Sequence, residues 1–171
     1  MAFGIIPCCR QFILEDVKMA NTKLIEALNR ALSLELAGVI QYLQHSFLVT
    51  GPEREVYREF FRKQSEEAHE HATTLGDKIV SLGGVPTVEP AVIRQSTDLA
   101  EMLKQDLELE REAMAAYVAA WEACTDAERA TQFQLEERMA EEQMHIDELE
   151  KLTSERQAKV SSERITLRQV S

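Results

Sequence analysis

The sequence contains little of what interrupts or spans a helix. Its 171 residues include only 6 glycines and 4 prolines, and aromatic residues make up 6%. Ala, Leu, Glu, Gln and Arg are abundant, and because all five are compatible with helices, the composition predicts an all-α protein. The length suffices for one domain with a sizeable core. No apolar run approaches the ~20 residues of a membrane-spanning helix, so we expect no membrane partner.

Positive charge and cysteine are also scarce. Lys and Arg number 19 against 30 Asp and Glu, which gives a formal net charge of −11. Since nucleic-acid binding relies on basic patches, we expect no nucleic-acid partner, whereas an acidic surface attracts cations. Cys8, Cys9 and Cys124 match neither a zinc spacing nor a disulfide framework. We therefore predict reduced thiols in a cytoplasmic protein.

Hydrophobic periodicity predicts four long helices, because apolar residues recur at steps of three and four. The predicted ranges are about 22–49, 53–82, 97–124 and 125–156. Asn21 and Thr22 are good N-caps for the first helix. Trp121 falls on the inward face of the third, and Thr125 with Glu128 resembles a capping box that opens the fourth.

The connection between the second and third helices is long enough to cross the bundle. Residues 83–96 include two prolines and show no periodicity. At ~3.3 Å per residue they span ~45 Å, against ~42 Å for a helix of about 28 residues. The chain therefore predicts an antiparallel four-helix bundle over residues 19–156 with one long crossover. Residues 1–18 are predicted to be a flexible or docking extension, and residues 157–171 a tail.

Carboxylates interrupt the apolar stripes of these helices. Glu35 and Glu110 have apolar neighbours three, four and seven residues away. A buried carboxylate is costly unless it is paired or bound to a metal, so these glutamates predict metal ligands or, alternatively, a buried salt bridge. Glu142 and His145 lie three residues apart, which places both on one side of the fourth helix. Together these residues predict a two-metal site in the bundle core.

The second helix offers two registers for a histidine ligand. On a helical wheel His71 lies about 40° from the centre of the apolar face, whereas His69 lies about 120° away and Glu66 points to the opposite side. His71 is therefore the better ligand, and a satisfied core histidine is the alternative. Its neighbour at i−3 is Ala68, which cannot bind a metal. Glu67, at the edge of the apolar face, could supply the missing carboxylate.

The sequence resembles bacterioferritins, which belong to the ferritin-like superfamily, over roughly residues 19–152. The resemblance is carried by Leu34 to His45, Ser65 to Pro86, Asp106 to Glu110 and Glu141 to Asp147. It implies a di-iron centre in which Glu35 and Glu110 are terminal carboxylates, His71 and His145 are the imidazoles, and Glu142 bridges. It also implies that Tyr42 lies beside the centre. There Tyr42 could take part in catalysis as a donor of one electron, and an ordinary core tyrosine is the alternative. The family's other bridging glutamate falls on Ala68, so this sequence departs from the pattern there.

A second departure from the family concerns haem. The family's haem-binding methionine, at the subunit twofold axis, falls on His69. Histidine is a competent axial ligand for haem iron. The resemblance therefore implies that His69 could hold haem b between two subunits, and an ordinary surface histidine is the alternative.

The leading hypothesis for function is an iron-binding protein with ferroxidase activity. It would oxidise Fe(II) with O₂ or peroxide for iron storage or detoxification, as a homo-oligomer that is at least a dimer and could be a cage of 24 subunits. One alternative is a di-iron or di-manganese peroxidase or catalase-like oxidoreductase. The other is a non-catalytic bundle that binds haem or a partner, with Ala68 marking a decayed metal site.

Overall fold

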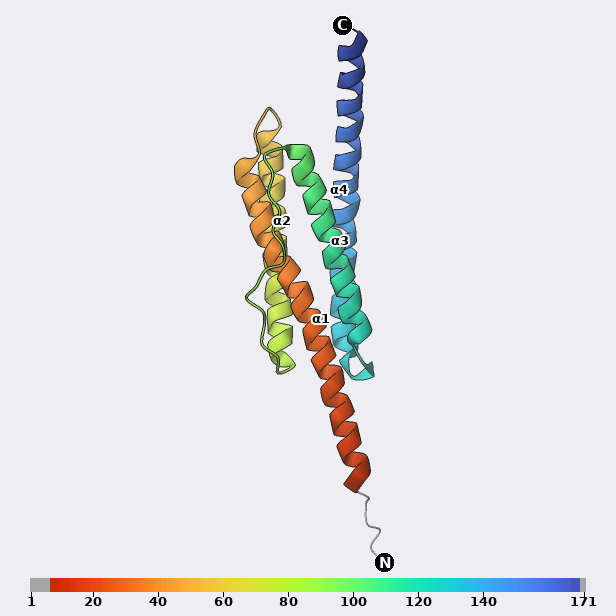
Figure 1. Ribbon diagram of the computed structural model, residues 1–171. Coiled ribbons are helices and arrows are strands. Elements are labelled where there is room, and N and C mark those ends of the chain that lie inside the picture. Colours follow the sequence, from red (N-terminus) through yellow and green to blue (C-terminus); the bar gives the residue numbers. More distant parts are fainter. Residues whose placement is uncertain (1–6, 170–171) are drawn as a thin grey trace, which may run out of the picture.

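Four long helices form a bundle in the computed structural model (Figure 1). The structure describes the backbone of residues 7–169 and the side chains of residues 21–154. The elements are α1 (Pro7–Leu48), α2 (Arg54–Ser81), α3 (Leu99–Ala123), the short 3₁₀ turn η1 (Asp126–Glu128) and α4 (Arg129–Gln169). Residues 7–169 contain no strand. The predicted antiparallel four-helix bundle with one long crossover is confirmed.

The first and last helices, α1 and α4, are longer than predicted. α1 begins at Pro7 and not near Thr22, and α4 continues to Gln169 and not only to about residue 156. The chain has no glycine or proline between residues 8 and 37 or within α4, so nothing local stops either helix. The predicted helix ends are therefore wrong, while the role of residues 1–18 as a docking extension stays a prediction. Residues 1–6 and 170–171 and the side chains of Cys8 and Cys9 lie outside what the structure describes.

The crossover between α2 and α3 lies along α1 (Figure 1), and as a result α2 and α3 run in the same direction. Because the segment is extended, its backbone needs partners from α1. Three α1 residues accept hydrogen bonds from its N–H groups: Asn29 from Thr87 at 2.7 Å, Ser33 from Ala91 at 2.7 Å and Gln41 from Arg94 at 2.8 Å. These bonds fix the crossover to the bundle.

Two glycines allow the chain to leave α2. Gly83 has a φ of +82°, a conformation that other residues rarely adopt. A Cβ on Gly84 would lie 2.7 Å from a methyl carbon of Ile25 and 2.9 Å from one of Ile79. The start of the crossover can therefore pack closely against the bundle.

The turn before α4 and one aromatic residue test two local predictions. The capping box is confirmed, because the Thr125 hydroxyl accepts from the backbone and Glu128 reaches back to the Thr125 N–H. The inward orientation predicted for Trp121 is wrong. Its side chain is 36% exposed, and its indole N–H donates to Glu136 at 2.9 Å.

Within the described residues, no helix is long and apolar enough to span a membrane.

The core consists of two apolar clusters with a polar layer between them. One cluster includes Leu28, Leu75 and Leu135, and the other includes Phe61 and Leu103. In α2 and α4 a buried charged residue separates the residues of the two clusters, and in α1 and α3 a buried glutamate lies close to the boundary between them. These charged side chains are no more than 6% exposed: Glu35, His71, Glu110 and Glu142.

Candidate metal centre

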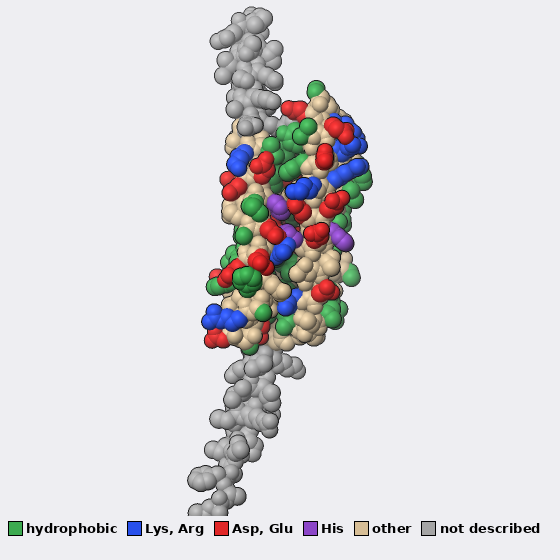
Figure 2. All heavy atoms as spheres, turned by 180° about the vertical axis from the view of Figure 1, so that it is seen from behind, with side chains coloured by type: hydrophobic (Ala, Val, Ile, Leu, Met, Phe, Trp, Pro, Cys, Tyr) green, Lys and Arg blue, Asp and Glu red, His purple; other side chains and the backbone are tan. Residues whose placement is uncertain are grey.

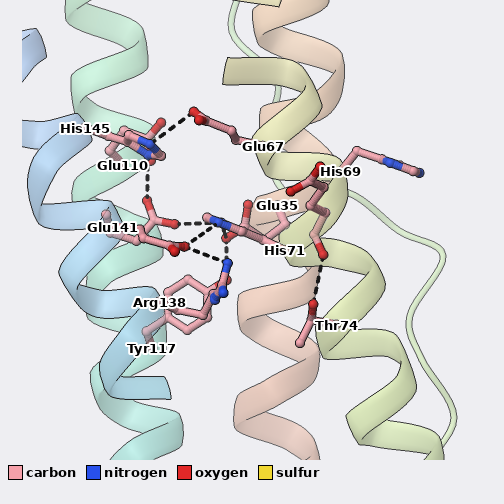
Figure 3. Close-up of polar contacts among 12 residues, drawn as sticks. Glu35, Glu67, His69, His71, Thr74, Glu110, Tyr117, Arg138, Glu141 and His145 are labelled. Atoms are coloured by element: carbon pink, nitrogen blue, oxygen red, sulfur yellow. Dashed lines mark hydrogen bonds and ion pairs between the residues drawn. The ribbon is translucent and has the colours of Figure 1, made fainter. Parts of the chain in front are cut away.

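All four helices contribute to one cluster of carboxylates and imidazoles (Figure 3). Glu35 comes from α1, His71 from α2, Glu110 from α3, and Glu142 and His145 from α4. Ligand atoms of Glu35, His71 and Glu142 lie within 4.8 Å of one another, and so do those of Glu110, Glu142 and His145. Glu142 belongs to both groups. This arrangement suits two cations side by side with one carboxylate shared between them.

The imidazoles turn the same ring nitrogen towards the interior. The Nδ1 atom of His71 lies 3.1 Å from Glu142 Oε1 and 3.4 Å from Glu35 Oε1, and His145 Nδ1 lies 3.7 Å from Glu142 Oε2. The two rings are 6.4 Å apart and nearly parallel, at 18°. Each histidine therefore presents one nitrogen to the shared carboxylate.

The outward nitrogen of each imidazole meets a second carboxylate. His71 Nε2 lies 3.1 Å from Glu141, and His145 Nε2 lies 3.3 Å from Glu67. Arg138 in turn lies 2.6 Å from Glu141 (Figure 3). Carboxylates in this position fix the tautomer and orientation of a metal-binding histidine. Sequence reasoning missed Glu141, and the structure places Glu67 at this outer position, outside both groups of three.

Two buried tyrosines cross between the helices to reach the terminal carboxylates. The Tyr42 hydroxyl donates to Glu110 Oε1 in a short hydrogen bond, and the Tyr117 hydroxyl donates to Glu35 Oε1 at 2.6 Å. Their exposed fractions are 1% and 0%. Tyr42 lies seven residues after Glu35, and Tyr117 lies seven residues after Glu110. Each tyrosine therefore serves the glutamate of the other helix.

Burial shifts the pKa values of the cluster in opposite directions. Burial raises the pKa of Glu35 and, with the nearby charge of Glu142, raises that of Glu110 well above its ordinary value. Burial also disfavours charge on Glu142, but its contacts with His145 and His71 hold its pKa below the usual range. Burial likewise opposes charge on His71, yet Glu142 and Glu35 raise its pKa to about 10. Without metal, burial therefore favours the neutral forms of Glu35 and Glu110, whereas Glu142 and His71 favour each other's charged forms.

The donor atoms fit a cation better than they fit one another. His71 Nδ1 and Glu142 Oε2 are buried, and neither has a well-aligned hydrogen-bond partner among the described residues. An unsatisfied buried polar atom costs about 1–3 kcal/mol, so such atoms are rare unless a ligand meets them. Carboxylate oxygens and imidazole nitrogens are suitable ligands for iron and manganese.

The structure separates the remaining predicted residues of α2. His69 is exposed and lies on the side of α2 that faces away from the cluster (Figure 3). Ala68 is 7% exposed and lies against Gly38 of α1, where an added Cβ would be 3.3 Å from the Ala68 methyl. Ala68 supplies no carboxylate, and Glu142 is the carboxylate common to both groups of potential ligands.

A second buried polar group lies beside the centre, and sequence reasoning did not assign it. Gln41, His45 and Asp106 each have an exposed fraction of 0%. Asp106 accepts a hydrogen bond from Gln41 at 2.9 Å and contacts His45 Nδ1 at 3.0 Å. Burial raises the pKa of Asp106, and His45 partly offsets this. A signal existed, because Asp106 lies one helical turn before Glu110 in the same apolar stripe.

Beside the centre, side chains of α2 and α4 are partly exposed: Glu67 by 31%, Glu141 by 37% and His145 by 16%. Histidine side chains are visible on this face of the molecule (Figure 2). A pocket of about 20 Å³ lies beside His71, lined by Leu28, Leu75, Leu135 and Arg138, among others. A volume of this size accommodates about one water molecule. This face therefore offers an approach to the buried ligands.

Comparisons with known proteins place these features in context. A family model described as a ferritin-like domain matches residues 25–158. A bacterioferritin from Brucella melitensis is 39% identical over 134 residues, covering 75% of this chain and 81% of that protein. A ferritin-like diiron-carboxylate protein from Bacillus anthracis has a TM-score of 0.75 at 32% identity, covering 78% of this chain and 97% of its own. Rhodobacter capsulatus bacterioferritin, described with a metal-free dinuclear site and a haem iron, has a TM-score of 0.70 at 28% identity, covering 78% and 84%.

Proposed function

This chain belongs to the ferritin-like proteins and is bacterioferritin-like in sequence, and from this premise we propose that it binds iron and oxidises Fe(II) at the cluster around Glu142. The observation that carries the proposal is the sharing of the Glu142 carboxylate between two groups of potential ligands. Storage or detoxification of iron in the cytoplasm is part of the same proposal.

The residues divide into two iron-binding halves. Glu35 and His71 would hold one Fe(II), Glu110 and His145 the other, and Glu142 would contact both. Carboxylates favour the harder Fe(III) product. With O₂ as oxidant, two Fe(II) ions, one O₂ and two protons give two Fe(III) ions and hydrogen peroxide.

Glu67 remains a candidate ligand within this proposal. Its carboxylate lies next in sequence to Ala68 and 3.3 Å from His145 Nε2, where it orients the imidazole. It also lies 3.1 Å from the Lys63 ammonium group, so metal binding by Glu67 would require this ion pair to separate.

Substitution of Glu110 tests the proposed activity. Glu110→Ala removes a terminal ligand, and we expect Fe(II) oxidation to slow by at least about 100-fold, because even residues that only orient ligands contribute 10–100-fold. Glu108→Ala, at an exposed position on the same helix, is the matched control. Unchanged kinetics in Glu110→Ala would reject the proposal.

Crystallography and metal analysis separate this proposal from its alternatives. Anomalous scattering at the iron edge from a crystal soaked in Fe(II) should show two peaks, one on each side of Glu142. Metal analysis together with a peroxide assay distinguishes a ferroxidase from a di-iron or di-manganese peroxidase. Purified protein that retains neither metal and does not oxidise Fe(II) would favour the non-catalytic alternative.

Haem binding at His69 is a separate part of the proposal. Its support is the exposed position of His69 on the outer side of α2, which a second subunit could reach. We expect a Soret absorbance in haem-loaded protein that is lost in His69→Leu. A Soret band of equal intensity in the variant would exclude His69 as the ligand.

Assembly of the chain with itself is also proposed. Ile40, Leu43 and Phe47 lie along one side of α1 with exposed fractions of 45%, 39% and 57%. Exposed apolar stripes of this kind often mark protein interfaces. Light scattering should therefore give a mass above that of the 19.4 kDa monomer. Phe47→Glu should lower this mass. A wild-type mass equal to that of the monomer would contradict assembly.

A further inference from the structure

The two tyrosines bonded to the centre occupy equivalent positions. Tyr42 donates to Glu110, which belongs to one group of potential ligands, and Tyr117 donates to Glu35, which belongs to the other. Resemblance to bacterioferritins accounts for a tyrosine at position 42. It assigns nothing to Tyr117, which has the same burial and the same kind of partner.

We propose that Tyr117 is a second one-electron donor to the centre, so that each half of the site has its own redox-active tyrosine. This inference rests on the proposed oxidation of Fe(II) at the cluster. It differs from a purely structural role, in which the Tyr117 hydroxyl only satisfies the Glu35 carboxylate.

The hydrogen bond to Glu35 supplies what oxidation of a phenol requires. A tyrosine that loses an electron also loses its hydroxyl proton, and the proton needs an acceptor within hydrogen-bond reach. Glu35 Oε1 lies 2.6 Å from the Tyr117 hydroxyl. Tyr117 is fully buried and belongs to the apolar cluster that includes Leu28 and Leu135. The surroundings therefore shield a phenoxyl radical from solvent.

Two tyrosines change the balance of the reaction with O₂. Reduction of O₂ to two waters takes four electrons and four protons, and two Fe(II) ions supply only two electrons. With two phenols, two Fe(II), one O₂ and two further protons, the products are two Fe(III), two phenoxyl radicals and two waters. Each radical then takes an electron from another Fe(II) and a proton, which regenerates the tyrosine. A centre with both donors thereby avoids release of peroxide.

The chain contains three tyrosines, so radicals can be assigned by substitution. Tyr57 packs beside Phe61, with ring centroids 6.2 Å apart, and Phe61 belongs to the other apolar cluster. Tyr57→Phe is therefore the control for Tyr117→Phe, and Tyr42→Phe reports the other half of the site. The full-length apoprotein is mixed with two Fe(II) per subunit and O₂, frozen rapidly and examined by electron paramagnetic resonance.

We expect Tyr117→Phe to lower the integrated tyrosyl signal roughly twofold, because two independent donors contribute additively. Peroxide release should rise in the same variant, while Tyr57→Phe matches the wild type. A tyrosyl signal and peroxide yield in Tyr117→Phe equal to those of the wild type would overturn the inference alone. Absence of Fe(II) oxidation in the wild type would overturn the proposed function and this inference with it.

A second variant covers the case in which Tyr117→Phe does not fold. Replacement of Tyr117 by 3-fluorotyrosine retains the hydroxyl and its hydrogen bond to Glu35. A radical at this position then shows a fluorine hyperfine splitting. Its absence, in protein that still oxidises Fe(II), would contradict electron donation by Tyr117.

Discussion

Two buried polar regions of the bundle core differ in how many carboxylates they hold relative to imidazoles. The metal-centre cluster places three inner carboxylates against two imidazoles, whereas the neighbouring group of Gln41, His45 and Asp106 has one carboxylate, one imidazole and one amide. Both oxygens of Asp106 have partners. Glu142 Oε2 has no hydrogen-bond partner among the described residues and lies 3.7 Å from His145 Nδ1. A surplus of buried acid thus distinguishes a ligand set from a structural pair.

The largest expected difference between the two regions is in Fe(II) oxidation after removal of the shared Glu142 carboxylate. Glu142→Gln should reduce Fe(II) oxidation by at least about 100-fold, because both groups of ligands lose the same residue. Asp106→Asn, in the structural pair, should keep most of the activity per folded molecule. Stopped-flow absorbance measures both. Activity of Glu142→Gln within a few-fold of wild type would contradict the shared-ligand interpretation.

The converse experiment concerns stability. Asp106→Ala leaves His45 buried without its carboxylate, and breaking a buried pair from one side costs about 3–5 kcal/mol. Urea unfolding of the apoprotein measures the loss. Glu108→Ala, at an exposed position of the same helix, should change stability by no more than about 0.5 kcal/mol. A cost for Asp106→Ala as small as that of the control would show that the pair is not needed.

Metal binding should stabilise the protein through the Glu142 cluster and not through the group of Gln41, His45 and Asp106. In the absence of O₂, Mn(II) should stabilise the wild type by about 3 kcal/mol at a hundredfold excess over its dissociation constant. The gain should disappear in Glu142→Gln and persist in a folded Asp106→Asn variant. Thermal unfolding with and without Mn(II), and after addition of a chelator, measures it. An equal shift in Glu142→Gln would place the metal elsewhere.

Taken per pH unit, the smallest expected effect is a pH dependence of the metal-free protein. The pKa of His71 is about 10 in the folded state and about 6.5 when unfolded. Its contribution to stability is therefore fully present below pH 6.5 and is lost as the pH rises through 10. Between these values wild type should lose about 1 kcal/mol per pH unit relative to His71→Gln. Parallel pH profiles of the two proteins in urea unfolding would show that His71 is not protonated.

Much of the fold and of the candidate site follows from periodicity. Glu35, Glu110 and His71 lie on apolar faces that a 3.6-residue repeat identifies, so their burial could be predicted without any knowledge of helix packing. The crossover was predictable because its length and its prolines exclude a short turn. Helix ends were not predictable, since α1 and α4 continue wherever no residue interrupts them.

Contacts between helices could not be predicted in the same way. The pairing of His45 with Asp106 and that of His71 with Glu141 depend on how far one helix is shifted along another, and a single sequence does not encode that shift locally. Trp121 is half-way between core and solvent, where the side-chain hydrogen bond to Glu136 decides its orientation. The exchange of tyrosines between α1 and α3 was visible only as a repeated spacing.

That exchange of hydrogen bonds has a mechanical consequence. Tyr42 reaches from α1 to Glu110 on α3, and Tyr117 reaches from α3 to Glu35 on α1, so the two helices are clasped at two points in opposite directions. A shift of α1 along α3 would stretch both tyrosine–glutamate hydrogen bonds at once. We therefore expect α1 and α3 to keep their relative position when an ion enters or leaves, and α2 and α4 to move outward.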